Sequence, residues 1–286
     1  MGKVLTEEQI AAFHENGYHA PVRVMAGSRA RDYRDRFEAF ERRHPDDVIK
    51  LDQKAYMIAP WAYEMLEEPA FLDTVEDLIG PDILCWGQSL RLKRTDGKSF
   101  AGWHQDTAYA NVQPINVIAA LALSPCRVRQ GCIRAIPGSH KWDLLPHKEN
   151  FGTASILSRE QTIDADFDDS TAVEMELDPG ECAFFYHAIC HSSGPNHGPD
   201  RRIVFLNEMI PTHARQDWPR ESAVLLRGID EYDNWDRDRV AEAEMGSAEL
   251  EAWRKAVEVQ ASVLFGGARH AKRALEGKME KEEKNG

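Results

Sequence analysis

A series of short apolar segments, separated by turn residues, occupies the middle of the chain. The segments cover residues 83–93, 116–123, 131–136, 173–177, 181–186 and 203–209. Residues 116–123 are almost continuously apolar, which is typical of a buried strand, although periodicity alone also permits a helix. Asp178-Pro179-Gly180 makes a turn between two of the segments. Short strands at this spacing, preceded by helical segments, predict a double-sheet barrel buttressed by helices.

Helical patterns flank this strand-rich region. They cover residues 7–17, 28–43, 62–66, 70–79 and 247–264. Residues 144–170 form a long irregular segment, and loops of this length tend to be lids or binding loops. Because no internal repeat or linker is visible, we expect a single domain over residues 1–286. Its parts are a helical N-terminal part at about 5–80, a strand-rich core at about 83–212 and a helical C-terminal extension at about 213–286.

The composition excludes several classes of function. The net charge of −13 argues against binding to nucleic acid or to an anionic membrane surface. The chain contains no apolar run of about 18 residues and no apolar N-terminal leader, so we expect neither a membrane span nor a secretory signal. Five cysteines without a Cys-x-x-Cys pair indicate a reducing, cytoplasmic environment. The sequence leaves open whether the protein is a monomer or a homo-oligomer.

One pair of side chains stands out as a metal-binding motif. His104 and Asp106 are two residues apart, within Gly102-Trp103-His104-Gln105-Asp106-Thr107. In an extended strand, residues at this spacing point to the same face. Two histidines and one carboxylate on one face of a metal are the usual ligands of non-haem Fe(II) oxygenases. The pair is a common spacing by itself, so the hypothesis requires a third ligand.

A distant histidine is the simplest third ligand, and His191 is our choice among the eleven. It lies at the end of a strand-like segment and is followed by Ser192-Ser193-Gly194-Pro195-Asn196. His187 has the same strand parity, so strand geometry alone leaves it open as an alternative.

Two adjacent arginines, Arg201 and Arg202, open the last apolar strand of the series. A guanidinium binds a carboxylate through two hydrogen bonds, which a lysine does not do. Successive strand residues face opposite ways, so only one of the two arginines points inward. The pair therefore predicts either a dicarboxylate clamp or a solvated charge pair at a strand edge.

Taken together, these segments resemble the phytanoyl-CoA dioxygenase superfamily of Fe(II)- and 2-oxoglutarate-dependent oxygenases. The matching segments are Trp103-His104-Gln105-Asp106, residues 131–140, Asp178-Pro179-Gly180-Glu181 and residues 191–196, with Arg202 eleven residues after His191. Residues 5–18 are similar too, and the resemblance covers about residues 5–210.

The resemblance implies a mainly β fold with flanking helices and a double-stranded β-helix (jelly-roll, cupin-like) core. It implies His104, Asp106 and His191 as the Fe(II) ligands, with 2-oxoglutarate and O2 as co-substrates.

It also implies that Arg202 binds the distal carboxylate of 2-oxoglutarate with support from Ser193, while Arg201 is the fallback. Gln88 resembles a residue that lines the co-substrate and substrate pocket in ectoine hydroxylases.

The implied activity is hydroxylation of an unactivated C–H bond of a small-molecule metabolite, with release of succinate and CO2. In related halogenases a small residue replaces the carboxylate ligand, so Asp106 favours hydroxylation. Desaturation, cyclisation and epoxidation use the same ligands and stay open. The rival classes are a metal-dependent hydrolase, which needs no dicarboxylate clamp, and a non-catalytic cupin-like binding protein, which needs no complete ligand set.

Candidates for substrate binding are less sharply defined. Thr107 and Tyr109 follow the His-x-Asp motif and are expected to face the substrate. Arg134 is a charged residue within an apolar strand segment, where it either points outward or meets an anionic substrate.

Overall fold

The computed structural model describes residues 2–108, 110, 112–150, 154–157, 161–216 and 219–264. Its α-helices are α1 (Glu7–Asn16), α2 (Gly27–Arg43), α3 (Pro60–Leu66), α4 (Pro69–Ile79) and α5 (Ser247–Leu264). Short 3-10 helices are η1 (Val48–Asp52), η2 (Ala55–Met57), η3 (Asp106–Ala108), η4 (Val128–Gln130) and η5 (Ser139–Lys141). The strands are β1 (Tyr18–Arg23), β2 (Ile83–Lys93), β3 (Ala101–His104), β4 (Val117–Ala122), β5 (Ile133–Ala135), β6 (His147–Glu149), β7 (Gln161–Ile163), β8 (Val173–Met175), β9 (Glu181–Tyr186), β10 (His191–Ser193), β11 (Arg202–Pro211), β12 (Ser222–Arg227) and β13 (Asp236–Arg237).

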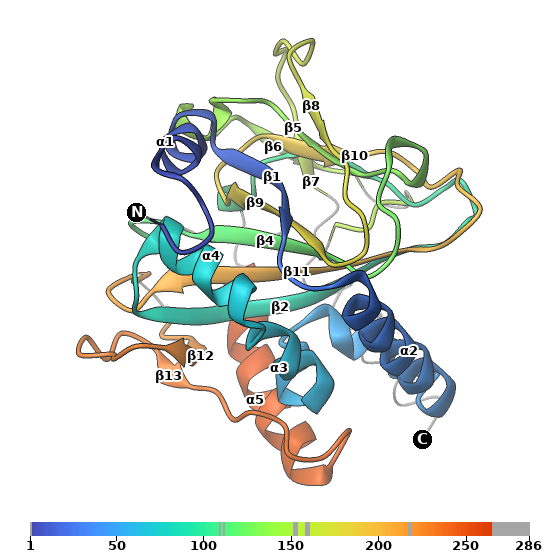
Figure 1. The fold of residues 1–286 in the computed structure, drawn as a ribbon, viewed down its shortest axis with the longest axis vertical. Coiled ribbons are helices and arrows are strands. Elements are labelled where there is room, and N and C mark those ends of the chain that lie inside the picture. Colours follow the sequence, from blue (N-terminus) through green and yellow to red (C-terminus); the bar gives the residue numbers. More distant parts are fainter. Residues whose placement is uncertain are drawn as a thin grey trace.

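Two facing sheets form the core of the molecule. The large sheet has the strand order β1-β9-β4-β11-β2-β12-β13, and the small sheet has the order β3-β10-β5-β8. Helices α2 to α5 lie on one side of the large sheet, and the small sheet lies on the other (Figure 1). The predicted mainly β fold with flanking helices and a jelly-roll core is therefore confirmed.

Strand β4 shows why the apolar run at residues 116–123 is nearly continuous. Val117, Ala119 and Leu121 pack into the core between the large sheet and the helices. Ile118 and Ala120 face the opposite way and pack into the core between the two sheets. A strand that is buried on both faces needs apolar residues at every position.

The first helix begins and ends where its sequence signals lie. The Thr6 side chain accepts a hydrogen bond from the Gln9 backbone N–H, and the Gln9 side chain accepts one from the Thr6 backbone N–H. This reciprocal pair satisfies two donors that a helix N-terminus otherwise leaves free. Gly17 ends the helix with a φ of 83°, in the left-handed region that glycine adopts without strain.

The strand content extends beyond the expected core at residues 83–212. Strand β1 lies within the N-terminal part and pairs with β9, whereas β12 lies within the C-terminal part and pairs with β2. Pro21 interrupts β1, and such a residue is tolerated because β1 is an edge strand. The long segment at residues 144–170 also contains the paired strands β6 and β7.

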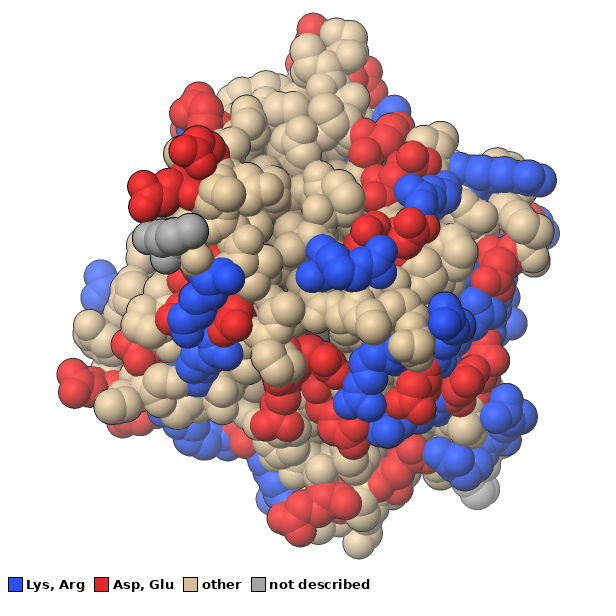
Figure 2. All heavy atoms as spheres, viewed as in Figure 1, with Lys and Arg blue, Asp and Glu red and all other residues tan. Residues whose placement is uncertain are grey.

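Acidic and basic side chains are interspersed on the face shown in Figure 2. Many of them form ion pairs around α2, for example Arg34 with Asp200 and Arg36 with Glu64. Within the described residues, no helix is long and apolar enough to cross a membrane.

Candidate functional site

The register of the small sheet brings the predicted metal ligands together. Strand β10 pairs with β3 so that His191 lies directly opposite His104, and Asp106 follows at the start of η3. The Asp106 carboxylate oxygens lie 3.3 Å from His104 Nε2 and 3.6 Å from His191 Nε2. Among the described residues, these three form the one group whose ligand atoms all lie within 4.8 Å of one another.

Backbone carbonyls orient both imidazole rings. His104 Nδ1 lies 2.8 Å from the Gly102 carbonyl oxygen, and His191 Nδ1 lies 3.0 Å from the Ile189 carbonyl oxygen. A hydrogen bond of this kind places the proton on Nδ1 and makes Nε2 the nitrogen that can bind a metal. The side chains present therefore fit the two-histidine, one-carboxylate ligand set that is diagnostic of non-haem Fe(II) sites.

The charge states of the group also suit a cation. Burial by itself raises the pKa of Asp106, but the charge of His191 and the hydrogen bond with His104 bring that pKa below its usual range. Burial, reinforced by the neighbouring His104, lowers the pKa of His191 to about 4. Asp106 is therefore ionised and His191 is neutral at pH 7, as metal ligands must be.

His187, the alternative third ligand, lies beside the group but outside it. Its backbone carbonyl accepts a hydrogen bond from the Asp106 N–H, and its ring packs edge-on against Trp86. The side chain lines the same cavity and is 5% exposed. The structure thus places His191, rather than His187, at ligand distance from the other two residues.

The two arginines point to opposite faces of β11. The Arg201 guanidinium pairs with Glu38 and Glu41 of α2, at 3.0 Å and 2.7 Å. Arg202 is only 1% exposed and lines the cavity. Its Nη1 donates to the Gly131 carbonyl oxygen, and its Nε has no partner among the described residues. A buried guanidinium with a free donor fits an anionic ligand.

A second buried basic residue, Lys93, lies opposite Arg202 and was not singled out in the sequence. Its Nζ donates to Ser193 Oγ at 2.7 Å and to the carbonyl oxygens of Ser193 and Gly194. Neither Lys93 nor Arg202 has a carboxylate partner among the described residues. The signal available in the sequence was its place in an apolar strand, where a lysine without a solvent-exposed face is unusual.

The remaining predicted residues lie at varied distances from the cavity. Gln88 lines it, and its amide donates to the Ala62 carbonyl oxygen at 2.8 Å while Oε1 has no partner. Thr107 lies in η3 but is not among the cavity-lining residues, and Tyr109 lies outside the described residues. Arg134 also lies away from the lining: it stacks on the Trp103 ring at 4.6 Å and donates to Ser192 Oγ.

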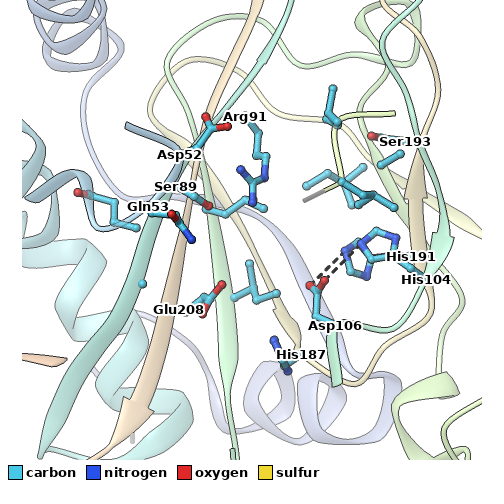
Figure 3. Close-up of a pocket in the computed structure, with 18 of the residues that line it drawn as sticks. Asp52, Gln53, Ser89, Arg91, His104, Asp106, His187, His191, Ser193 and Glu208 are labelled. Atoms are coloured by element: carbon cyan, nitrogen blue, oxygen red, sulfur yellow. Dashed lines mark ion pairs between the residues drawn. The ribbon is translucent and has the colours of Figure 1, made fainter. Parts of the chain in front are cut away.

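The cavity itself runs between the two sheets. Figure 3 shows His104, Asp106 and His191 along one wall, with Arg91 and Glu208 directed toward the same space from β2 and β11. Ile156 and Leu157, from the long segment at residues 144–170, complete part of its lining.

Comparisons with known proteins agree with this geometry. A sequence model of the phytanoyl-CoA dioxygenase family matches residues 4–204. A probable phytanoyl-CoA dioxygenase of Caenorhabditis elegans is 26% identical over 225 residues, which cover 68% of this chain and 72% of that protein. The peroxisomal phytanoyl-CoA dioxygenase of Mus musculus is 28% identical over 221 residues, which cover 68% of this chain but only 64% of the mouse protein.

Solved structures share the fold. The non-heme monooxygenase ThoJ in its apo form superimposes with a TM-score of 0.80 at 25% identity, over 94% of this chain and 99% of that one. CytC3 with Fe(II) and alpha-ketoglutarate superimposes with a TM-score of 0.63 at 21% identity, over 86% of this chain and 96% of that one.

Proposed function

Because this chain belongs to the phytanoyl-CoA dioxygenase family of non-haem iron, 2-oxoglutarate-dependent oxygenases, we propose that it hydroxylates an unactivated C–H bond of a small-molecule metabolite. Fe(II) is the cofactor, and 2-oxoglutarate and O2 are the co-substrates. One oxygen atom of O2 enters the product alcohol and the other enters succinate, while the 1-carboxylate of 2-oxoglutarate leaves as CO2. The observation that carries the proposal is the placement of the His104, Asp106 and His191 ligand atoms within 4.8 Å of one another, beside the buried Arg202.

His104, Asp106 and His191 would hold the iron, which when bound supplies O2 activation and hydrogen-atom removal from the substrate. The Ile189 and Gly102 carbonyls keep both imidazoles in the tautomer that binds a metal. Arg202 would bind the distal carboxylate of 2-oxoglutarate, with Ser193 Oγ and the adjacent Lys93 beside it. Burial of this end excludes water and strengthens the charge pairing.

Asp106 favours hydroxylation over halogenation, because a carboxylate occupies the position that a halide would otherwise take. Desaturation, cyclisation and epoxidation use the same ligands, and the product distinguishes them: hydroxylation adds the mass of one oxygen atom, whereas desaturation removes two hydrogens. A non-catalytic cupin-like protein is the rival from another class, and it would bind metal without forming succinate. A cytoplasmic location stays a prediction.

Anaerobic titration with Fe(II) and 2-oxoglutarate tests the cofactor chemistry. We expect a weak visible charge-transfer band in the wild-type protein, and Asp106→Ala should diminish it. Asp233→Ala is the control, because the Asp233 side chain is exposed and pairs with the exposed Arg220 at the surface. Absence of the band from well-folded wild-type protein would overturn the assignment. If the band is present, a screen for succinate release would identify substrates.

A further inference from the structure

Glu208 is an acidic residue within the buried strand β11, on the face that lines the cavity. Arg202, Leu206 and Glu208 share this face because strand residues alternate in direction, and all three line the cavity. Figure 3 shows the Glu208 carboxyl directed toward the space in front of the metal ligands. The sequence offered one signal for it, a single acid in the apolar segment at residues 203–209.

No described residue forms a hydrogen bond or an ion pair with the Glu208 carboxyl, and its Oε2 is fully buried. The other charged residues of this wall differ in that respect. Lys54 is paired with Asp238 at 2.7 Å, and Arg202 donates to a carbonyl. Arg91 is a cation on the same wall, but its one hydrogen bond, at 3.4 Å, goes to the Leu90 carbonyl oxygen, and no ion pair joins it to Glu208.

A carboxyl group in this position is costly for the empty protein. Burial, with a further contribution from the charge of Asp106, raises the pKa of Glu208 to about 8. Burying an acid without a partner costs free energy that an apolar residue would avoid. Gly87, on the neighbouring strand, lies close to this carboxyl: a Cβ there would be 3.0 Å from Glu208 Oε2.

The co-substrate is not the missing partner. Arg202 and Glu208 are six residues apart on one strand, which separates their Cα atoms by roughly 20 Å at about 3.3 Å per residue. A carboxylate would also repel the dianionic 2-oxoglutarate. This leaves the substrate as the candidate partner of Glu208.

We propose that the substrate presents a protonated nitrogen, as an ammonium or guanidinium group, to the Glu208 carboxylate. The resulting charge-assisted hydrogen bonds go to the Glu208 carboxylate, which lines the cavity and has no partner among the described residues. They fix the substrate with one C–H bond toward His104, Asp106 and His191. This assignment rests on the proposed oxygenase function and names the substrate class of the same cavity: an organic cation.

Equilibrium binding of simple probes tests the assignment without turnover. The protein is loaded with 2-oxoglutarate and with Zn(II), which does not react with O2. Ligand-observed NMR then measures its affinities for butylammonium, propylguanidinium, 1-butanol and butyrate. We expect at least one of the two cations to bind about tenfold or more tightly than 1-butanol. In Glu208→Gln this preference should disappear, while affinity for 2-oxoglutarate stays unchanged.

Two further variants separate charge recognition from folding. Glu258→Gln removes the same charge from the exposed surface of α5 and should keep the full preference for cations. Gly87→Ala crowds Glu208 without changing any charge and should weaken cation binding severalfold. Equal binding of 1-butanol, no binding of either cation, or unchanged cation affinity in Glu208→Gln would overturn the assignment.

The anaerobic Fe(II) and 2-oxoglutarate band tells the two ideas apart. If wild-type protein and Glu208→Gln both show the band but neither prefers cations, the substrate class is wrong and the oxygenase function stands. If the wild-type protein lacks the band, the oxygenase function itself fails.

Discussion

Lys93 and Arg202 lie directly opposite each other on β2 and β11, and both side chains are buried without a carboxylate partner among the described residues. Two like charges in such a place repel each other and are poorly solvated. Burial, with the charge of Arg202, lowers the pKa of Lys93 to about 6. A bound dicarboxylate would compensate the charge of Arg202 and favour protonation of Lys93, so this pair ties the stability of the protein to its co-substrate.

Arg202→Ala should weaken 2-oxoglutarate binding by at least about thirtyfold, in line with the 2–5 kcal/mol typical of losing one member of a buried charge pair. Arg201→Ala should leave the affinity within about twofold, because Arg201 pairs with Glu38 and Glu41 on the other face of the strand. Calorimetry on the Zn(II)-loaded protein measures both values. If Arg201→Ala rather than Arg202→Ala weakened 2-oxoglutarate binding, Arg201 would be the residue that binds the distal carboxylate.

The stability of the protein without co-substrate should depend on pH through Lys93. Its pKa is about 6 in the folded state and 10.5 ordinarily, so between these values the unfolded chain binds more protons. The free energy of unfolding therefore rises with pH across this window. Below about pH 6 Lys93 is protonated in both states, so it adds no further pH dependence. Urea unfolding at several pH values checks the slope.

Two comparisons isolate the contribution of Lys93 to that slope. Lys93→Met should flatten the slope, and saturating 2-oxoglutarate should flatten it in the wild-type protein by returning the Lys93 pKa toward its ordinary value. If the slope were the same in the wild-type protein, in Lys93→Met and in the wild-type protein with 2-oxoglutarate, the co-substrate would not be raising the pKa of Lys93.

Asp238→Asn should destabilise the protein by about 3–5 kcal/mol, the usual cost of leaving one member of a buried ion pair uncompensated. The Asp238 and Lys54 side chains are 1% and 0% exposed, and the Tyr56 hydroxyl donates to the same carboxylate at 2.6 Å. Asp233→Asn, at an 88% exposed position, should change stability by less than about 0.5 kcal/mol. Urea unfolding compares the two variants.

Trp253→Ala should cost about 3–5 kcal/mol of stability, because it removes a buried indole that anchors α5 to the rest of the fold. The indole Nε1 donates to the Gln53 carbonyl oxygen at 2.8 Å, and Gln260 of the same helix lines the cavity. Lys255→Ala, on the exposed face of α5, is the control. Thermal unfolding compares the two variants. Equal unfolding midpoints would contradict an anchoring role for Trp253.

Local signals placed most of the helices and strands. The Thr6 capping box, Gly17 and the apolar run of β4 each act over a few neighbouring residues, so the sequence shows them directly. Strand β1 was missed because Pro21 weakens its pattern, and β12 because its partner β2 lies more than a hundred residues away. Such pairings are invisible to any local pattern.

The sequence by itself determined that Arg201 and Arg202 cannot both point inward, because successive strand residues face opposite ways. It also placed His104 and Asp106 two residues apart, although Asp106 begins a 3-10 helix rather than continuing the strand. Only the tertiary structure decided that His191 rather than His187 meets the pair, that Arg202 is the buried arginine, and that Lys93 and Glu208 face the same cavity. These choices depend on the register between strands that are distant in sequence. A shift of one residue in β10 would turn His191 away from His104, and a shift of one residue in β11 would turn Arg202 and Glu208 away from the cavity.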